Sequence, residues 1–363
     1  MLRVAAGRHS PVRAVVRVLL TGAAGFIGSA IWTELAARGH EVIAVDAFIP
    51  QAHPIDADPR LDVHRHDVRR AMEWVDLFRG VNVVCHQAAM VGAGVTVSDL
   101  PAYAGHNDLG TAALLAAMHA AGVGQIVLAS SMVVYGEGRY VCPTHGEQGP
   151  PPRSRAALDA GDFENHCPGC GGALAWETVS ESARLDPRSS YAASKLAQEH
   201  YVAAWTRQAP GTAIALRYHN VYGPQMPRNT PYSGVAALFR SAIEGGRVPE
   251  VYEDGGQMRD FVHVFDVARA NAIAVEAVAS AQVEPGAVYN VCSGQPVSIL
   301  DVARSVASGT GSGREPAVTG RYRVGDVRHI VASPDRAERE LGFTAEIGPR
   351  DGLPRFATEP LRA

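Results

Sequence analysis

The two residues that carry the clearest chemical signal are a tyrosine and a lysine four positions apart, Tyr191 and Lys195. The chain has 33 lysine and arginine residues, and Lys195 is the only lysine among them. A lysine amine can shift its pKa and act as a compact point charge, which a guanidinium group cannot do. Because residues i and i+4 share one face of a helix, the phenol and the amine would point at the same site. This pair predicts chemistry that moves a proton off a hydroxyl group.

A glycine-rich turn supplies the second chemical signal. Apolar residues 15–20 predict a buried strand, and the sequence then runs Thr-Gly-Ala-Ala-Gly-Phe-Ile-Gly over residues 21–28 before a helical pattern begins. Glycines in this context let the backbone approach a pyrophosphate closely. The N-terminus of the following helix then offers free N–H groups and a positive dipole end. We therefore expect a dinucleotide to bind at Gly22, Gly25, Phe26, Ile27 and Gly28.

Three further strand ends are expected to line this cofactor. Asp46 ends the second strand, 18 residues beyond the last glycine of the turn. A carboxylate there can bind both ribose hydroxyls and would repel a 2′-phosphate, which favours NAD over NADP. After the third strand we expect Asp67 and Val68 to meet the adenine, with a helix N-cap as the alternative role of Asp67. The fourth strand ends in His86, expected to be a packed histidine, and is followed by residues that let the backbone pass close to the cofactor, Gln87, Ala88 and Ala89.

Bound NAD would explain how a tyrosine acts as a base. Tyrosine has a free pKa of about 10 and is a poor base at neutral pH. A nearby ammonium group and the positive nicotinamide ring favour the phenolate and lower that pKa. Tyr191 would then take the proton from a substrate hydroxyl while hydride leaves the same carbon for NAD, and Lys195 would also hold the nicotinamide ribose. Ser131 ends a predicted strand, from which it can hydrogen-bond the reacting oxygen.

The elements that must position these residues alternate along the first half of the chain. Apolar runs predict strands at residues 15–20, 41–46, 61–66, 81–85, 125–129 and 213–216. Amphipathic patterns predict helices at residues 26–38, 102–121 and 190–208. Such alternation implies an α/β fold with a Rossmann-type, doubly wound parallel sheet covered on both faces. Arg217, at the end of the last of these strands, is expected to support that strand end.

The second half of the chain is less regular, with proline and glycine clustered at residues 223–231 and 245–256. This composition predicts a smaller α/β region that shapes a substrate pocket. We expect three parts: a disordered tail over residues 1–15, an NAD-binding domain over 16–218, and a mainly substrate-binding domain over 219–363, of which 260–292 partly returns to the NAD-binding domain.

Further motifs occur in a fixed order between residues 16 and 345. They are Asn107 in Asn-Asp-Leu-Gly-Thr, Ser131 in Ser-Ser-Met-Val-Val-Tyr-Gly, the Tyr191 and Lys195 pair, and Asn220 in Asn-Val-Tyr-Gly-Pro. With the glycine turn, they resemble the extended short-chain dehydrogenase/reductase family, and within it the nucleotide-sugar epimerases and dehydratases. The resemblance implies that Ser131, Tyr191 and Lys195 are catalytic and that Asn107 lies at the cofactor. It also implies a substrate site made of Ser131, Met132, Asn220, Arg259 and Arg328.

Two absences narrow the reaction that the resemblance implies. The family's 4,6-dehydratases carry an acidic pair after the serine, whereas Met132 and Val133 follow Ser131 and can carry no proton. UDP-glucuronate decarboxylases also tend to carry an acidic residue where Val133 stands. The resemblance therefore implies a 4-epimerase that works through a transient 4-keto sugar with tightly bound NAD, on a dTDP- or UDP-hexose. Within the family, the chain is most similar to dTDP-L-rhamnose 4-epimerases and UDP-glucose 4-epimerases.

Two other functions stay open as alternatives. An NAD(P)H-dependent 4-ketoreductase of a deoxysugar pathway would share the fold, although Asp46 argues against NADPH. A non-catalytic NAD-binding scaffold or sensor would also share it, although the intact Ser131, Tyr191 and Lys195 argue against that function. The chain departs from the usual family pattern at His219, where a smaller or amide side chain is common, and this position borders the expected pocket.

Residues 139–177 interrupt the strand–helix alternation. This polar, proline-rich insert contains Cys142-Pro-Thr-His145 and Cys167-Pro-Gly-Cys170, and 21 residues separate the two pairs. Such pairs form the pattern of a tetrahedral zinc site, and a polar segment gains a core from a bound metal. We expect a zinc-knuckle-like insert in which Cys142, His145, Cys167 and Cys170 hold structural zinc. His166 is the alternative histidine ligand, and a Cys167–Cys170 redox pair or unligated thiols are the alternative roles of the cysteines.

Composition restricts the class of protein rather than the reaction. The formal net charge of −4 gives no reason to expect a nucleic-acid partner. No apolar run reaches the roughly 20 residues that span a bilayer, and the first 17 residues carry four arginines without the continuous apolar segment of a signal peptide. We expect a cytoplasmic protein without a membrane partner, which binds a nucleotide-diphosphate sugar. The helices at 102–121 and 190–208 resemble those that pair in the family's homodimers, and we expect a homodimer.

Overall fold

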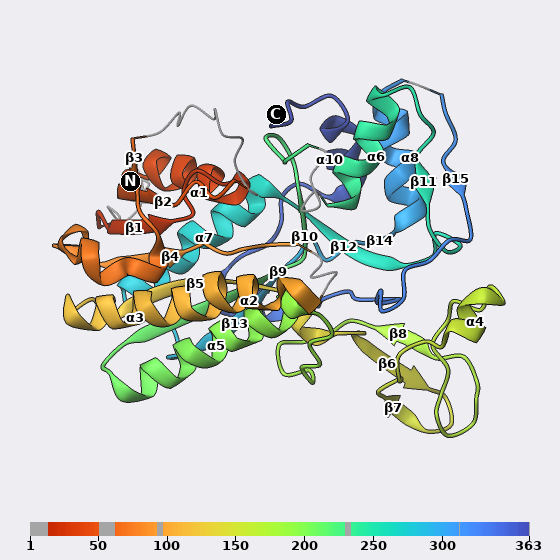
Figure 1. The fold of residues 1–363 in the computed structure, drawn as a ribbon, viewed down its shortest axis with the longest axis horizontal. Coiled ribbons are helices and arrows are strands. Elements are labelled where there is room, and N and C mark those ends of the chain that lie inside the picture. Colours follow the sequence, from red (N-terminus) through yellow and green to blue (C-terminus); the bar gives the residue numbers. More distant parts are fainter. Residues whose placement is uncertain (1–13, 51–61, 93–96, 229–233, 312, 363) are drawn as a thin grey trace, which may run out of the picture.

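The fold is organised around a seven-stranded sheet. A computed structural model describes residues 14–50, 62–92, 97–228, 234–311 and 313–362, so that most of the tail predicted over residues 1–15 lies outside the described residues. The strand order is β13-β9-β5-β4-β1-β2-β3, and every neighbouring pair is parallel. This order confirms the predicted Rossmann-type sheet (Figure 1).

Six of the seven strands of this sheet lie close to their predicted positions, and the seventh, β13, was not predicted from the sequence. They are β1 (Arg17–Thr21), β2 (Glu41–Asp46), β3 (Val63–Arg65), β4 (Val83–His86), β5 (Gln125–Ser131), β9 (Thr212–Tyr218) and β13 (Ala287–Val291). The helices around them are α1 (Phe26–Ala37), the 3₁₀ segment η1 (Val68–Phe78), α3 (Gly110–Ala120), α5 (Ser190–Gln208), α7 (Val264–Ala279) and α9 (Asp335–Leu341).

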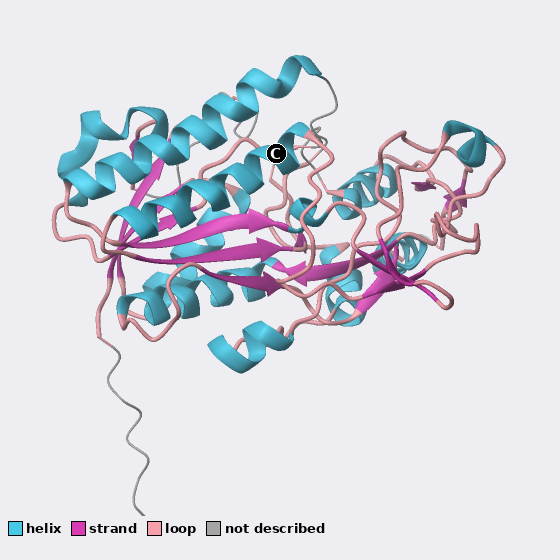
Figure 2. Cartoon of the chain, turned by 90° about the horizontal axis from the view of Figure 1, so that it is seen from below, coloured by secondary structure: helices cyan, strands magenta, loops and turns pink. Residues whose placement is uncertain are grey.

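Alternating side chains of the strands form two hydrophobic cores, one on each face of the sheet. On β1, Val18 and Leu20 belong to the core that includes α1 and α7, whereas Leu19 belongs to the core that includes η1, α3 and α5. This alternation is the two-residue period of a strand whose faces are both covered. Figure 2 shows helices on both sides of the strands, as the doubly wound arrangement requires.

One predicted helix is interrupted. The helix expected over residues 102–121 is divided into α2 (Leu100–Tyr103), the π-helical turn η3 (Ala104–Leu109) and α3, and the 3₁₀ turn η2 (Val97–Asp99) precedes it. A π-turn adds a residue to the helix and commonly marks a functional position. Asn107 lies in this turn with its side chain fully buried. The turn therefore presents a polar side chain to the interior of the protein.

The second half of the chain forms a smaller region beside the sheet. Its strands are β10 (Asn220–Tyr222), β12 (Met258–His263) and β14 (Pro296–Ser298) in one small sheet, and β11 (Glu250–Val251) with β15 (Ala317–Val318) in another. Its helices, α6 (Val235–Glu244), α8 (Ile299–Gly309) and α10 (Pro349–Phe356), share a core with Tyr222 of β10. Between these elements the chain returns to the large sheet, because α7 packs against α1 and β13 pairs with β9.

The insert folds as a unit of its own. After the 3₁₀ turn η4 (Met132–Tyr135), strands β6 (Arg139–Cys142), β7 (Gly146–Gln148) and β8 (Ala175–Glu177) form an antiparallel sheet in the order β7-β6-β8. The short helix α4 (Arg155–Asp159) belongs to the same unit. In Figure 1 these elements project from one end of the molecule. Their small core consists of Tyr140, Cys142, Cys167 and Leu174, with Trp176 packed against it.

The glycine turn yields a stability prediction. A Cβ atom on Gly28 would lie 2.0 Å from the carbonyl oxygen of Gly22, so that Gly28→Ala must push α1 away from the turn. We expect a loss of about 1–3 kcal/mol in the free energy of unfolding, with loss of bound NAD, measured by thermal denaturation and cofactor content. Gly105→Ala is the matched control, because a Cβ atom there meets nothing within 4 Å. A wild-type melting temperature for Gly28→Ala would contradict this close packing.

Candidate active site

The predicted catalytic side chains come together at the carboxyl end of β5. Tyr191 and Lys195 lie one turn apart on α5, and Ser131 is the last residue of β5. The Lys195 amine donates a hydrogen bond to the carbonyl of Ala129 at 2.9 Å, and it lies 6.0 Å from the centre of the Tyr191 ring. A hydrogen bond joins Ser131 to the Tyr191 phenol. The serine, tyrosine and lysine therefore form one group.

A buried carboxylate fixes this group to the sheet. Arg217 donates to both oxygens of Glu199, at 2.9 and 2.8 Å, and Ser130 donates to the same carboxylate at 2.5 Å. Arg217 also donates to the Tyr135 hydroxyl at 2.9 Å, and so supports the strand end as predicted. Glu199 was not among the residues predicted from the sequence, although its position four residues after Lys195 puts it on the same helix face.

Burial sets the ionisation of the tyrosine and the lysine. It raises the pKa of Tyr191 to about 12, against the opposing effect of the hydrogen bond to Ser131. It lowers the pKa of Lys195 to about 7, while the charge of Glu199 acts in the opposite direction. The phenol therefore holds its proton firmly until a positive charge is placed beside it. The nicotinamide ring of an oxidised cofactor carries such a charge.

The glycine turn has the geometry that a pyrophosphate requires. Gly22 has a φ of +69°, and a Cβ atom there would lie 2.7 Å from the backbone nitrogen of Ala88. Helix α1 begins at Phe26, and its N-cap residue, Gly25, has no side chain that could accept a hydrogen bond from the first turn of the helix. The start of α1, with Phe26 and Ile27 in its first turn, thus leaves backbone N–H groups for an anion.

The carboxylate at the end of β2 is oriented toward this turn. Asp46 is 7% exposed. It accepts hydrogen bonds from the backbone nitrogens of Ala24, at 3.0 Å, and Phe48, at 2.8 Å. Because Ala24 belongs to the glycine turn, the carboxylate lies where the ribose next to a bound pyrophosphate is expected. These residues fit a dinucleotide without a 2′-phosphate.

Asn107 has a supporting position instead of a cofactor contact. Its amide oxygen accepts from the backbone nitrogen of Met90 at 2.7 Å. Its amide nitrogen donates to the carbonyl of Met90 at 2.9 Å and to the Ser194 hydroxyl at 2.8 Å. Both N–H groups of the amide are therefore used within the protein, which corrects the expectation that this side chain lies against the cofactor. Asn107 ties the loop after β4 to α5.

Gln87 is also held by protein groups. The Tyr218 hydroxyl donates to its amide oxygen at 2.9 Å, and its amide nitrogen donates to Asn271 at 3.1 Å. The two alanines that follow, Ala88 and Ala89, have no side chain large enough to fill the space beside Gly22. The backbone of this loop therefore passes close to the glycine turn, as a cofactor cradle requires.

Asp67, which follows β3, is a helix cap, and His86, at the end of β4, is a packed histidine. Asp67 caps η1 by accepting from the backbone nitrogen of Arg69 at 2.9 Å, and Val68 is the buried first residue of that segment. Burial raises the pKa of Asp67, but the hydrogen bonds from Arg69 leave that pKa lowered overall. His86 bonds two threonine hydroxyls, at 2.8 and 3.0 Å, and burial lowers its pKa to about 3. His86 is a neutral packed histidine, as predicted.

Two of the predicted substrate residues meet beside the catalytic group. The Asn220 amide nitrogen lies 3.7 Å from the Met132 sulfur and donates to the carbonyl of Asp260 at 3.0 Å. Arg259 lies on the neighbouring strand β12, and burial lowers its pKa. Its guanidinium donates at 2.7 to 2.9 Å to the carbonyls of Met258, Val327 and Arg328.

Arg328 does not fit its predicted role. Its side chain is buried, and its guanidinium donates five hydrogen bonds, of 2.6 to 3.0 Å, to the carboxylates of Glu164, Glu253 and Asp254. An arginine has five N–H donors in all. Because carboxylates occupy every donor, Arg328 has none left for a phosphate. It belongs to an ion cluster between the insert and the smaller region, which corrects the expectation that it binds substrate.

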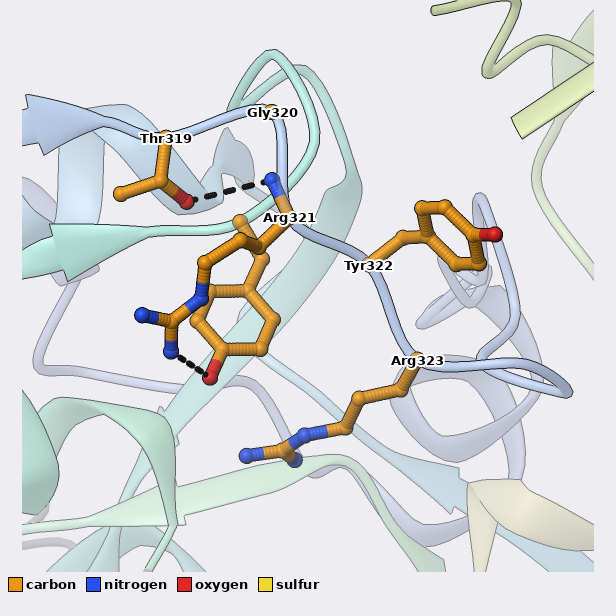
Figure 3. Close-up of a pocket in the computed structure, with 6 residues that line it drawn as sticks. Thr319, Gly320, Arg321, Tyr322 and Arg323 are labelled. Atoms are coloured by element: carbon orange, nitrogen blue, oxygen red, sulfur yellow. Dashed lines mark hydrogen bonds between the residues drawn. The ribbon is translucent and has the colours of Figure 1, made fainter. Parts of the chain in front are cut away.

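Two other arginines, which sequence analysis missed, line a pocket next to this ion cluster. Figure 3 shows the pocket, formed by Tyr252 and residues 319–323. Arg321 donates to the Tyr252 hydroxyl at 2.6 Å and pairs with Glu250 at 3.1 Å. The Arg323 guanidinium lies over the Tyr252 ring, 5.2 Å from its centre. In the sequence, Arg321 and Arg323 belong to an Arg-Tyr-Arg run between two glycines, and this run could have indicated the pocket.

His219 is a buried polar group without a partner. It directly follows β9 and is 4% exposed, and neither ring nitrogen has a hydrogen-bond partner in the described part of the chain. Burial, followed by the charge of Arg259, lowers its pKa to about 3. A neutral imidazole has one donor and one acceptor, and leaving both unpaired costs free energy. His219 directly precedes Asn220, so this unpaired imidazole lies next to a predicted substrate residue in the sequence.

Comparison with known proteins identifies the family. Residues 18–156 and 171–292 match the model of the NAD dependent epimerase/dehydratase family. A dTDP-L-rhamnose 4-epimerase of Burkholderia thailandensis is 34% identical over 353 residues, which are 94% of this chain and 94% of that protein. The chain belongs to the NAD-dependent epimerase/dehydratase family.

Solved structures of other members share the fold of this epimerase/dehydratase. UDP-glucose 4-epimerase of Thermus thermophilus, in complex with NAD, is 30% identical with a TM-score of 0.71, over 94% of this chain and 99% of that chain. UDP-glucose 4-epimerase of Thermotoga maritima, with UDP-glucose, has a TM-score of 0.76 at 24% identity, over 94% of this chain and 97% of that chain. The predicted class of enzyme, an NAD-dependent nucleotide-sugar 4-epimerase, is confirmed.

Among the residues of this chain that the structure describes, no helix is long and apolar enough to cross a membrane.

The insert lies partly outside the family match, since residues 157–170 are unmatched. It brings together Cys142, His145, Cys167 and Cys170, whose ligand atoms all lie within 4.8 Å of one another. The His145 Nδ1 atom is 3.6 Å from the Cys142 sulfur and 3.3 Å from the Cys167 sulfur, and the Cys142 and Cys170 sulfurs are 3.7 Å apart. His166 points elsewhere, to Asp162 and the carbonyl of Gly171. The structure therefore favours His145 over His166 as the fourth member of the cluster.

The buried lysine of this epimerase/dehydratase yields a pH prediction. The pKa of Lys195 is about 7 in the folded protein and 10.5 ordinarily, so that between these values the unfolded chain binds more protons. The contribution of Lys195 to the free energy of unfolding must then rise as the pH rises through that window. We expect Lys195→Met, in cofactor-free protein, to be most stable relative to wild type near neutral pH and to lose this advantage toward pH 10. Denaturant unfolding measures both proteins, and parallel pH curves would contradict the assignment.

Proposed function

We propose that this enzyme interconverts the C4 epimers of a dTDP-linked hexose, with dTDP-L-rhamnose as the favoured substrate type and UDP-glucose as the alternative. The observation that carries the proposal is the group formed by Ser131, Tyr191 and Lys195 at the carboxyl end of β5. The relative from Burkholderia thailandensis, named a dTDP-L-rhamnose 4-epimerase, supports the choice of base and sugar. Met132 and Val133 leave no acidic group after Ser131 for the elimination of water.

The chain's own groups move the proton of the reacting hydroxyl. Tyr191 takes the proton from the 4-hydroxyl of the sugar, and Ser131 hydrogen-bonds the same oxygen. When bound, NAD supplies the hydride acceptor and donor that oxidation and reduction at C4 require. Lys195 stabilises the phenolate of Tyr191 and holds the nicotinamide ribose. After the keto sugar has turned in the site, Tyr191 returns the proton, and the product differs only in the configuration at C4.

The substrate-side groups bind the sugar and the diphosphate. Arg259 binds the diphosphate, and Asn220 lies between the diphosphate and the sugar. Met132 adds an apolar side chain next to Asn220, with its sulfur 3.7 Å from the Asn220 amide nitrogen. His219 completes the sugar side, because its unpaired ring nitrogens can donate to and accept from a sugar hydroxyl. A histidine at this position makes the pocket of this chain different from those with a smaller side chain.

The insert binds one structural zinc ion in this proposal. Zinc–sulfur bonds of about 2.3 Å and zinc–nitrogen bonds of about 2.0 Å in a tetrahedron require S···S distances of about 3.8 Å and S···N distances of about 3.5 Å. The distances of 3.7 Å between two of the sulfurs, and of 3.3 and 3.6 Å between sulfur and nitrogen, match this geometry. Backbone N–H groups of Thr144 and His145 help lower the pKa of Cys142 to about 6, which favours the thiolate that zinc needs.

The same proposal includes a homodimer formed through the helices next to the active site. Leu100 on α2, Leu109 in η3 and Tyr201 on α5 are large apolar side chains that are 45%, 57% and 44% exposed. Helices α2 and η3 both contact α5, so these side chains belong to one packed group of helices. A second copy of the same helices would cover them.

The epimerase proposal is tested by NMR with purified protein and no added cofactor. We expect dTDP-L-rhamnose, in preference to UDP-glucose, to yield a new diastereomer of unchanged mass. Tyr191→Phe should lower the rate by about 10²- to 10⁴-fold while retaining NAD, because it removes only the group that moves the proton. Recovery of both sugars unchanged by NAD-containing wild-type protein would contradict the proposed reaction.

The zinc proposal is tested by metal analysis of protein purified without chelator. We expect one zinc per chain in the wild type and far less in His145→Asn, because the variant removes one of four ligands. His166→Asn is the matched control and should keep its zinc, since His166 bonds Asp162 and Gly171 instead. Zinc lost from His166→Asn but kept by His145→Asn would reverse the assignment of the histidine, and wild-type protein without zinc would refute the site.

A further inference from the structure

We propose that the metal-bearing insert holds the diphosphate-binding arginine, Arg259, in position through the segment 326–329. The inference rests on the proposed function, in which Arg259 binds the diphosphate and the cysteine–histidine cluster binds a metal. It assigns the insert a part in substrate binding. It also makes Tyr140 and Glu164, which lie in the insert, positioning residues for a group in another region of the protein.

The first link runs from the arginine to the segment. The Arg259 guanidinium donates to the carbonyl of Val327 at 2.7 Å and to that of Arg328 at 2.9 Å. The backbone of Arg259 also forms an isolated parallel β-bridge with Ile330, and the backbone nitrogen of Ile330 donates to the carbonyl of Met258 at 3.1 Å. Backbone carbonyls of one segment therefore set the orientation of this guanidinium. Any displacement of the segment moves the donors that face the diphosphate.

The second link runs from the segment to the insert. The backbone nitrogen of Arg328 donates to Glu137, at the entrance to the insert, at 2.9 Å. The backbone nitrogen of His329 donates to the Tyr140 hydroxyl at 3.0 Å. Tyr140 is completely buried, lies two residues before Cys142, and shares a small core with Cys142 and Cys167. The tyrosine that holds the segment is thus packed against the metal-ligand cluster.

The third link is the ion cluster around Arg328. Glu164 of the insert accepts two hydrogen bonds from Arg328 and also contacts the His329 ring nitrogen at 3.1 Å. The opposite ring nitrogen of His329 accepts from the backbone of Met258, the residue before Arg259, at 3.0 Å. From the other side, Arg153 of the insert forms a buried pair with Glu253 at 2.9 Å. Charged side chains of the insert therefore bind the segment 326–329 directly, through Glu164, and bind its ion partner Glu253, through Arg153.

These contacts have a consequence for metal loss. The insert has few apolar residues in its core, so that without a metal its strands have little to hold them together. The hydroxyl of Tyr140 and the carboxylate of Glu164 would then leave their places, and the carbonyls that orient Arg259 would shift. The affinity for a nucleoside diphosphate falls, whereas the NAD site, built on β1, α1 and β2, keeps its cofactor.

The test uses full-length, zinc-loaded, NAD-containing protein and the variant Tyr140→Phe. The variant removes the hydroxyl that accepts from His329 and donates to Glu137 at 3.4 Å, and it keeps the ring that packs against the cysteines. We expect its affinity for dTDP, and for UDP measured separately by calorimetry, to fall about threefold to tenfold, the range for one lost hydrogen bond. In turnover, KM should rise while kcat is retained. Arg139→Gln is the matched control, because the ion pairs of Arg139, with Glu147 and Glu177, lie inside the insert.

A second variant keeps the test decisive if Tyr140→Phe folds poorly. Glu164→Gln removes a half-exposed charge and keeps the side-chain shape, and it should weaken dTDP binding in the same way. Zinc content, NAD content and melting temperature establish that each variant is folded. If folded Tyr140→Phe and Glu164→Gln bind dTDP and UDP as tightly as wild type, the insert does not position Arg259 and the inference is wrong. A wild-type protein that binds neither nucleotide would overturn the proposed function itself.

Discussion

The geometry of the active site depends on one buried carboxylate, Glu199. It accepts hydrogen bonds from Ser130 and Arg217, which face each other in the register of β5 and β9. A helix residue that binds two cross-strand neighbours fixes both the rotation and the height of its helix over the sheet. Because Lys195 and Tyr191 lie one and two turns earlier on α5, this ion pair determines where the amine and the phenol stand relative to the end of β5.

The chain uses its two kinds of cation for different purposes. Arg217 and Arg328 act as planar, multi-donor clamps that join segments far apart in the sequence, and Arg328 uses all five of its donors in this way. Lys195 instead donates to the carbonyl of Ala129 in a site where burial lowers its pKa to about 7. Arginine would not be equivalent, because a guanidinium stays charged under all ordinary conditions and is a planar group, whereas an ammonium group is a compact point charge.

Sequence could predict the parts of the structure that short-range spacing determines. The strands of the sheet follow from apolar runs, the cofactor cradle from glycines between a strand and a helix, and the Tyr191–Lys195 pair from the helical repeat. The roles of Asn107 and Arg328 could not be predicted, because their partners lie far away in the chain: Ser194 for the first, and Glu164 and Glu253 for the second. The choice between His145 and His166 required the same long-range information, since only the fold shows which ring faces the cysteines.

The way in which the insert joins the fold has a consequence for protein engineering. Its first and last strands, β6 and β8, are antiparallel neighbours, and Arg139 pairs in register with Glu177. The chain therefore leaves the main fold and re-enters it at adjacent points. A unit attached in this way leaves the path of the chain through the large sheet unchanged, although its removal would take away the partners of Arg328 and His329. The same junction offers protein engineers a place where another small module can be grafted next to the active site, provided that it keeps the contacts to Arg328 and His329.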